Sequence, residues 1–388
     1  MTSTCFTRRF RPLPTACAAA CVFAALGAQA AEGYKLRQSP VGLFGGEMAA
    51  SADNPGFFGT AALSITTIDH IVDNKGNDIG VLARSVPLPT GAPTGGKVPN
   101  GTFSLNVPAG TIAFNQDQTQ LNLAGGYITE TQYGGGRWAF AVNVPLIKQS
   151  RTFVPTQAAG TVSPSTAALP AALQGAVATI AAAANAQVQA AVAATAAPQN
   201  ADVTGIGDTE LSVVWLSQQD RLKIAAGVSL FVPTGEYDKN RGPNPGFGNF
   251  YTLRPGVAVS YSLNPNHTDS SWDSGVTIAG RVSFGINTVN KDTDYRSGNF
   301  VYLEGGVVKV TGNWALGANL LAIQQVTDDS GSGAATSPGR YRNYGAGPFL
   351  SYKLPGQDAG FNFHYSQNFG SVNALVSHTW QLRFIKAW

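Results

Sequence analysis

The clearest pattern in the chain is an alternation of apolar and polar residues between Gly207 and Phe284. One phase of each segment is apolar, whereas the opposite phase carries Gly, Ser, Ala and single charges. The apolar phases are Leu222, Ile224, Ala226, Val228, Leu230 and Val232, then Tyr251, Leu253, Val257, Val259, Tyr261 and Leu263, and then Trp272, Val276, Ile278, Val282, Phe284 and Ile286. A period of two places each phase on one face of a strand. The pattern therefore predicts β-strands that each have one apolar and one small or polar face.

The same alternation, of varying clarity, extends from residue 57 to the C-terminus. Counting every such segment predicts fourteen strands, or twelve if the weakest pair, residues 79–86 and 102–114, is left out. The polar face of a strand in a soluble sandwich would be rich in charge, but here it is rich in small residues. Strands with an apolar outer face, a small or polar inner face and aromatic residues at the rims are typical of membrane barrels.

The connections between the predicted strands alternate in length. Residues 133–136, 218–220, 311–313 and 355–358 are short turns, whereas 150–206, 233–248, 289–297 and 327–340 are long loops. Outer-membrane barrels have short periplasmic turns and long external loops. The alternation therefore predicts an antiparallel barrel with its short turns at one end.

Composition supports a membrane barrel over a bundle of membrane helices. Only 12% of the 388 residues are charged. No apolar run approaches the roughly 20 residues of a membrane helix. Because only a closed barrel satisfies every backbone group in lipid without such helices, we predict an all-β transmembrane barrel over residues 57–388.

Residues 1–30 are typical of a secretory signal peptide. Three arginines precede the apolar stretch 16–26, and Ala28-Gln29-Ala30 has the pattern of a cleavage site. All three cysteines and the excess of three positive charges would leave with this segment, so the composition indicates no disulfide and no affinity for nucleic acid. Residues 31–56 then form either a loose periplasmic lead-in or a plug inside the lumen.

Residues 156–201 interrupt the barrel pattern. They are rich in alanine, which favours helix, and an apolar residue recurs every three or four positions. The segment is predicted to be a helical or disordered insertion in one long loop. It is either a mobile surface loop or a helix over the barrel mouth.

Charged residues recur on the polar phase of the predicted strands. A charge facing lipid at mid-depth costs about 2–4 kcal/mol, so we expect these side chains to line the lumen. The predicted lumen-lining residues are Arg137, Glu210, Lys223, Arg254, Asp273, Arg281, Glu304 and Arg383. They either pair to fill the interior or, at Arg254, Arg281 and Glu304, shape a polar constriction.

One long loop combines aromatic and charged residues. Tyr237, Phe247 and Phe250 lie in or beside residues 233–248 and form a candidate landing site for a hydrophobic ligand. Turn chemistry with interfacial aromatic residues is the alternative explanation.

Chemistry beyond transport has little support in the sequence. His364 is on an inward phase, but no serine or carboxylate has the spacing of a catalytic constellation with it. No group of His, Cys and Asp has metal-ligand spacing, and no phosphate-binding loop follows a strand. We therefore predict no catalytic residue, no metal and no cofactor.

The C-terminus resembles the assembly signal of outer-membrane barrels. Trp380, Leu382, Phe384 and Trp388 alternate up to a terminal aromatic residue, although Lys386 departs from that pattern. The resemblance implies recognition by the barrel-insertion machinery.

Several internal motifs resemble a family of phenol meta-degradation pathway transporters, nearest to its subgroup named after a sphingosine-induced outer-membrane protein (SphA-like). The motifs are Gly205–Asp208, Val232–Asp238, Asn290–Gly298, Trp314–Gly317 and Gly345–Tyr352, together with Glu304, Gln324 and Asp328. The resemblance implies an outer-membrane barrel associated with catabolism of phenolic or other hydrophobic compounds, with an architecture similar to that of long-chain fatty-acid channels.

Together these features predict a channel in the bacterial outer membrane for passive uptake of hydrophobic or aromatic small molecules. Its expected partners are membrane lipid, lipopolysaccharide, the insertion machinery and the solute. A general polar-solute porin and a plugged structural barrel are the alternatives.

Overall fold

The computed structural model describes residues 36–37, 55–266 and 268–388. The signal peptide predicted for residues 1–30 lies outside this range, as does nearly all of segment 31–56. The described chain forms two compact units, which we treat separately. The barrel contains residues 36–37, 55–79, 112–154 and 198–388, and the small unit contains residues 80–111 and 155–197.

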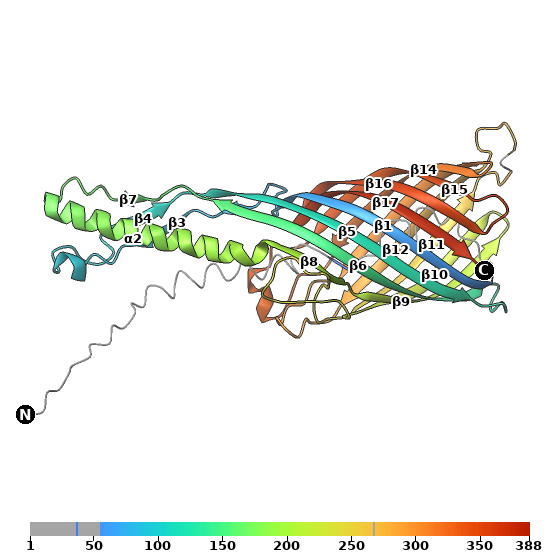
Figure 1. Ribbon diagram of the computed structural model, residues 1–388, viewed down its shortest axis with the longest axis horizontal. Coiled ribbons are helices and arrows are strands. Elements are labelled where there is room, and N and C mark those ends of the chain that lie inside the picture. Colours follow the sequence, from blue (N-terminus) through green and yellow to red (C-terminus); the bar gives the residue numbers. More distant parts are fainter. Residues whose placement is uncertain (1–35, 38–54, 267) are drawn as a thin grey trace, which may run out of the picture. The chain divides into compact units, whose positions relative to one another are not determined.

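Twelve antiparallel strands close into the barrel (Figure 1). In spatial order they are β5 (Gly110–Ile128), β1 (Gly56–Val72), β17 (Ala374–Ala387), β16 (Ala359–Val372), β15 (Arg342–Lys353), β14 (Trp314–Gln325), β13 (Phe300–Thr311), β12 (Val276–Asn287), β11 (Thr252–Ser262), β10 (Leu222–Val232), β9 (Thr209–Gln219) and β6 (Arg137–Thr156). Pairing of β5 with β6 closes the ring, while β1 pairs with β17, so the first and last strands are neighbours.

Two further strands bring the sheet to the expected fourteen. β2 (Gly80–Val81) pairs with β5, and β8 (Ala201–Ile206) pairs with β6, but neither is part of the ring. The ring therefore has the twelve strands of the alternative prediction. Most of the weakest predicted pair is absent from it, because residues 84–87 and 104–107 pair in the small unit, whereas residues 110–114 belong to β5.

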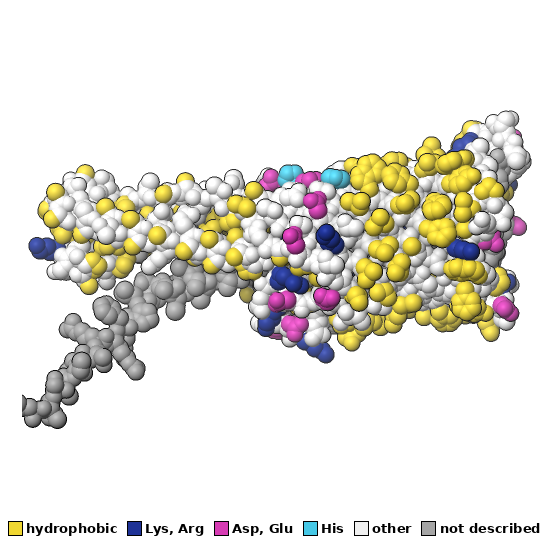
Figure 2. Space-filling model, viewed as in Figure 1, with side chains coloured by type: hydrophobic (Ala, Val, Ile, Leu, Met, Phe, Trp, Pro, Cys, Tyr) yellow, Lys and Arg dark blue, Asp and Glu magenta, His cyan; other side chains and the backbone are white. Residues whose placement is uncertain are grey.

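The predicted alternation corresponds to the two faces of the barrel wall. Along β11, Leu253 and Val257 are more than 40% exposed. The residues that directly follow them, Arg254 and Ala258, are at most 5% exposed. On the face seen in Figure 2, exposed apolar side chains gather in a broad belt over the barrel, and most of the charged side chains lie outside it. The belt is the surface that a bilayer requires.

The connections also follow the predicted alternation, with two exceptions. Residues 220–221 and 312–313 are two-residue turns, and positive φ angles at Asp220 and Gly312 give them the left-handed backbone that tight hairpins need. Long loops occupy residues 233–251, 288–299 and 326–341 at the other end, the last with a short 3₁₀ helix η4 (Ser332–Thr336). The exceptions are the long 263–275 connection at the short-turn end and the single residue Asn373 at the long-loop end.

The small unit packs a helix on a three-stranded sheet. The strands are β3 (Arg84–Pro87), β4 (Ser104–Val107) and β7 (Thr161–Ser163), accompanied by the 3₁₀ helix η2 (Ala92–Thr94). The helix α2 (Ala171–Ala196) is followed by the 3₁₀ helix η3 (Ala197–Gln199). The insertion is therefore helical, as one of the two expected forms.

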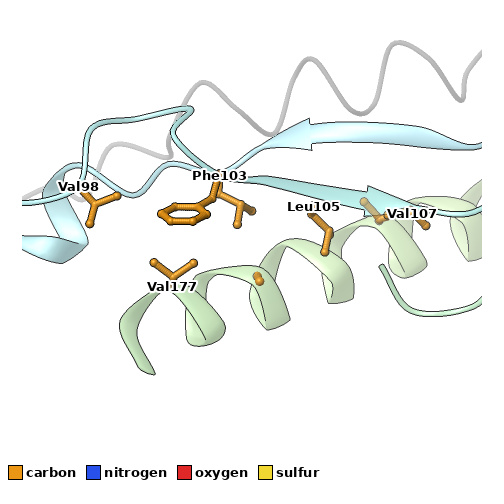
Figure 3. Packing of buried hydrophobic residues seen from close by; sticks show 8 residues of the cluster. Val98, Phe103, Leu105, Val107 and Val177 are labelled. Carbon is orange, nitrogen blue, oxygen red and sulfur yellow. The ribbon is translucent and has the colours of Figure 1, made fainter. Parts of the chain in front are cut away.

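One apolar core holds the small unit together. Val177 of α2 lies against Val98 and Phe103, with Leu105 and Val107 further along the sheet (Figure 3). With η3, α2 is long and apolar enough to cross a membrane by composition alone. Its buried stripe, however, already has a protein partner in this sheet.

Candidate functional site: the barrel interior

Two buried ion pairs link nearby strands along the inner wall of the barrel. Glu210 accepts a hydrogen bond from Arg254 at 2.8 Å, and Glu304 accepts one from Arg281 at 2.7 Å. All four side chains are at most 5% exposed. Because a lone buried charge is very costly, the pairing explains how charges of both signs persist inside the wall.

Aromatic rings and further polar groups surround these pairs. The Arg254 guanidinium lies 5.0 Å from the Phe231 ring centroid, and that of Arg281 lies 4.8 Å from the Tyr302 ring centroid. Elsewhere in the wall, Arg383 donates to Gln381 at 2.7 Å. We call Glu210, Arg254, Arg281, Glu304 and Arg383 the polar girdle. The period-two pattern predicted all five as inward residues.

The other three predicted lumen-lining residues lie near the short-turn end. Arg137 is the first residue of β6 and donates to the carbonyls of Thr129 and Glu130 in the preceding turn. Lys223 is half-buried near the start of β10. The structure corrects the placement of Asp273, which belongs to the 263–275 turn and not to a strand.

Local hydrogen bonding explains the position of Asp273. Its carboxylate accepts a hydrogen bond from the Ser271 hydroxyl at 2.6 Å, and this bond lowers the pKa of the carboxyl. The turn therefore satisfies Asp273 without help from the lumen.

An apolar layer adjoins the girdle inside the barrel. It contains Leu36, Phe300, Ile323 and Tyr341, each at most 5% exposed, together with Tyr302. Phe300 and Tyr302 are inward residues of β13, which explains why the alternation of this strand is poor in the sequence. Tyr302 belongs to both the layer and the surroundings of the girdle, since its hydroxyl lies 3.4 Å from a Glu304 carboxylate oxygen.

Arg37, which the sequence did not single out, contacts several groups of the barrel interior. Its guanidinium pairs with Asp208 at 2.8 Å and donates to the carbonyls of Gly248 and Phe250. The same group lies 3.8 Å from the Phe250 ring centroid and 5.9 Å from that of Phe247. A single arginine in a segment without periodicity carries no sequence signal for such a partnership.

Asp208 also fixes the loop that was predicted to receive the ligand. Its carboxylate accepts hydrogen bonds from the backbone N–H groups of Gly235, at 3.1 Å, and Phe247, at 2.9 Å. Phe250 is consequently buried and Phe247 half-buried, while Tyr237 is half-buried elsewhere in the loop. Phe247 and Phe250, two of the three predicted landing residues, therefore lie against Arg37.

The four residues of the predicted assembly signal face outward near the chain end. Trp380 packs against Phe363 of the neighbouring strand, with ring centroids 5.5 Å apart, and Leu382 is 48% exposed. The Trp388 backbone N–H donates to Phe57, which joins the end of the chain to the start of β1. These contacts give Trp380, Leu382, Phe384 and Trp388 a place in the apolar belt.

His364, the one inward histidine of the sequence analysis, lies beside an amide. His364 Nε2 lies 2.8 Å from the amide oxygen of Asn319, so its neighbour is not a nucleophile. Within residues 36–37, 55–266 and 268–388, no three His, Cys, Asp or Glu side chains are grouped to hold a metal ion.

One solved structure supports the barrel fold. The barrel is similar to the crystal structure of an outer membrane channel from Pseudomonas putida F1, with a TM-score of 0.60 and 10% identity over 90% of this chain and 100% of that one. The Pseudomonas putida toluene transporter TodX aligns with a TM-score of 0.35 and 10% identity over 92% of this chain and 96% of that one. The comparison with curated proteins gave no match.

A family model settles the relationship suggested by the internal motifs. The model described as "Putative MetA-pathway of phenol degradation" matches residues 91–384, which include eleven of the twelve ring strands in whole or nearly in whole. The fold and this match agree with the expected outer-membrane barrel. The chain therefore belongs to the family of the putative MetA pathway of phenol degradation.

Proposed function

We propose that this outer-membrane barrel admits hydrophobic or aromatic small molecules, such as phenolics or lipid-like compounds, by passive diffusion. The observation that carries the proposal is the apolar layer of Leu36, Phe300, Ile323 and Tyr341 beside the polar girdle. A solute that is mostly apolar can exchange contacts with the layer, and its polar group can exchange contacts with the girdle. The phenol-degradation family supports the same class of solute.

The burial of the girdle argues against a general polar-solute porin. A wide water-filled channel would leave its lining charges hydrated, yet Glu210, Arg254, Arg281 and Glu304 are at most 6% exposed as whole residues. Such a lumen favours selective passage that depends on side-chain movement.

Leu36 and Arg37 support the plug alternative for segment 31–56. Leu36 belongs to the apolar layer, and Arg37 is 2% exposed between Asp208 and Phe250. In this proposal Leu36 and Arg37 narrow the passage from within, and Arg37 holds the aromatic landing residues Phe247 and Phe250 until a solute displaces it.

The expected partners follow from the outer surface. The apolar belt requires lipid, and lipopolysaccharide would surround the long-loop end. We also propose that the outward row Trp380, Leu382, Phe384 and Trp388 is read by the barrel-insertion machinery during assembly.

The test is uptake by cells that lack the gene, compared with the same cells complemented by it. Labelled phenolics and long-chain lipids should enter complemented cells faster, while a sugar of similar size should enter both strains equally. Equal uptake of all hydrophobic probes would contradict the proposal, and faster uptake of the sugar alone would favour the porin.

A further inference from the structure

Hydrogen-bonded amide side chains follow one another along the inner face of β5, and we call this row the amide ladder. Gln118 donates to Gln120 at 2.9 Å, and Gln120 donates to Asn122 at 3.0 Å. From β6, Gln149 donates to Gln118 at 2.6 Å, and Asn143 lies 3.5 Å from Asn122. Four residues from Gln118 to Asn122 span about 13 Å of extended strand.

The amides of the ladder differ in burial, and we call the Asn122 end its lower end. Gln118 and Gln120 share the inward phase with Asn122 but are only half-buried, so their side chains keep accessible surface. Asn122 is only 1% exposed and Asn143 only 8%. Asn143 is paired in register with Glu210, which places the lower end of the ladder beside the polar girdle.

At the Asn122 end of the ladder, one hydrogen-bond donor and one acceptor are unpaired. Asn122 Nδ2 is a donor without a partner among the described residues, and Asn143 Oδ1 is an acceptor without one. Buried amide groups are nearly always hydrogen-bonded, and leaving one unpaired is unfavourable. Because the two amides lie within 3.5 Å of each other at Asn143 Nδ2 and Asn122 Oδ1, one hydroxyl group could accept from Asn122 and donate to Asn143.

We propose that Asn122 and Asn143 form a hydroxyl-recognition subsite, so that the channel favours hydroxylated aromatic compounds over the corresponding hydrocarbons. The inference rests on the proposed transport function and narrows its substrate class. Gln118 and Gln120 exchange hydrogen bonds with the hydroxyl group before it reaches Asn122. Gln149 Oε1 is a second unpaired acceptor in this row.

Three probes with the same ring system separate the two hydrogen bonds. The 2-naphthol hydroxyl both donates and accepts, 2-methoxynaphthalene only accepts, and naphthalene does neither. Uptake that depends on the channel, measured as complemented minus deletion cells, should decrease in that order. Each hydrogen bond is expected to change the rate about fivefold.

Two variants assign the effects to the two residues. Asn143→Leu removes the acceptor, so uptake of 2-naphthol should fall about fivefold to the rate of 2-methoxynaphthalene, whose own rate stays unchanged. Asn122→Leu removes the donor and should slow both oxygen-containing probes. Naphthalene uptake should be unchanged by either substitution.

A matched control lies in β14, on the far side of the ring in strand order. Asn319 is as buried, at 3% exposure, but its amide oxygen is already paired with His364. Asn319→Leu should leave the ratio of 2-naphthol to naphthalene uptake unchanged. The heat-dependent gel shift of folded barrels checks assembly, and Asn122→Ala and Asn143→Ala repeat the test without added bulk.

The outcomes separate this inference from the proposed function. If wild-type channels speed uptake of all three probes equally, or if the variants slow all three equally, the subsite is overturned while transport stands. If wild-type and deletion cells take up every probe at one rate, both proposals fail.

Discussion

At the scale of single residues, the ion pair of Arg281 and Glu304 keeps two buried charges of the girdle compensated. Both side chains are buried, and they form an ion pair at 2.7 Å. Removing one partner leaves an uncompensated buried charge, whereas removing both leaves none.

Arg281→Met should therefore lower the free energy of unfolding by about 3–5 kcal/mol. The double variant R281M/E304M should recover most of that loss. Guanidinium unfolding in detergent micelles, followed by tryptophan fluorescence, measures both. A double variant as unstable as the single one would contradict a role in charge compensation.

Arg37 gives a second prediction at this scale, which tests the plug. Arg37→Ala removes the ion pair with Asp208 and the contact with Phe250. Losing even 1.4 kcal/mol from a closed state shifts an open–closed equilibrium about tenfold. Conductance in planar bilayers should rise by about that factor. Arg340→Ala is the control, because the pair of Arg340 with Asp328 is exposed, and equal conductance in all three proteins would contradict the plug.

At the scale of elements, the small unit has a core of its own. Val177 of α2 is 0% exposed, whereas its neighbour Ala178 is exposed. Val177→Asp places a charge in that core and should open the small unit to protease within residues 156–201. The barrel should keep its heat-dependent gel shift, and Ala178→Asp should be as resistant as wild type. Loss of the folded barrel in Val177→Asp would show that the two units fold together.

Two long loops are joined by a contact that depends on pH. The Asp294 carboxylate accepts hydrogen bonds from the hydroxyl and backbone N–H of Ser332, at 2.6 and 2.9 Å, and the hydroxyl bond is the main cause of its lowered pKa. A lowered folded-state pKa means that the contact stabilises above the ordinary pKa and is lost as the pH falls through the folded-state value. Amide exchange at Ser332 should therefore accelerate, relative to its intrinsic rate, in acid but not near pH 7. Asp294→Asn should remove that dependence.

At the scale of the whole molecule, closure of the strand ring and the outer apolar belt are both needed for the barrel to lie in lipid. The ring leaves no strand edge in lipid, and the belt is the surface that lipid covers. Leu320, near the middle of β14, is 63% exposed on this belt.

Leu320→Arg should destabilise the barrel by about 2–4 kcal/mol in a bilayer, because it places a charge at mid-depth. Ala335→Arg, at an exposed position of η4, should change stability little. Urea unfolding in lipid vesicles compares the two variants. Equal stability would contradict the assignment of this face to the membrane.

The sequence by itself determined the barrel class, the outward and inward phases, and the inward placement of the five girdle residues. It could do so because side chains alternate along a strand with a period of two and lipid accepts only an apolar face. The alternation and the apolar phase are therefore visible within about ten residues of sequence. Only the tertiary structure decided the twelve-strand ring, since residues 84–87 and 104–107 have strand composition whichever sheet they join. The same holds for Arg37 with Asp208 and for Asn122 with Asn143, because their partners are brought together by closure of the ring and by folding of a loop, which no local pattern encodes.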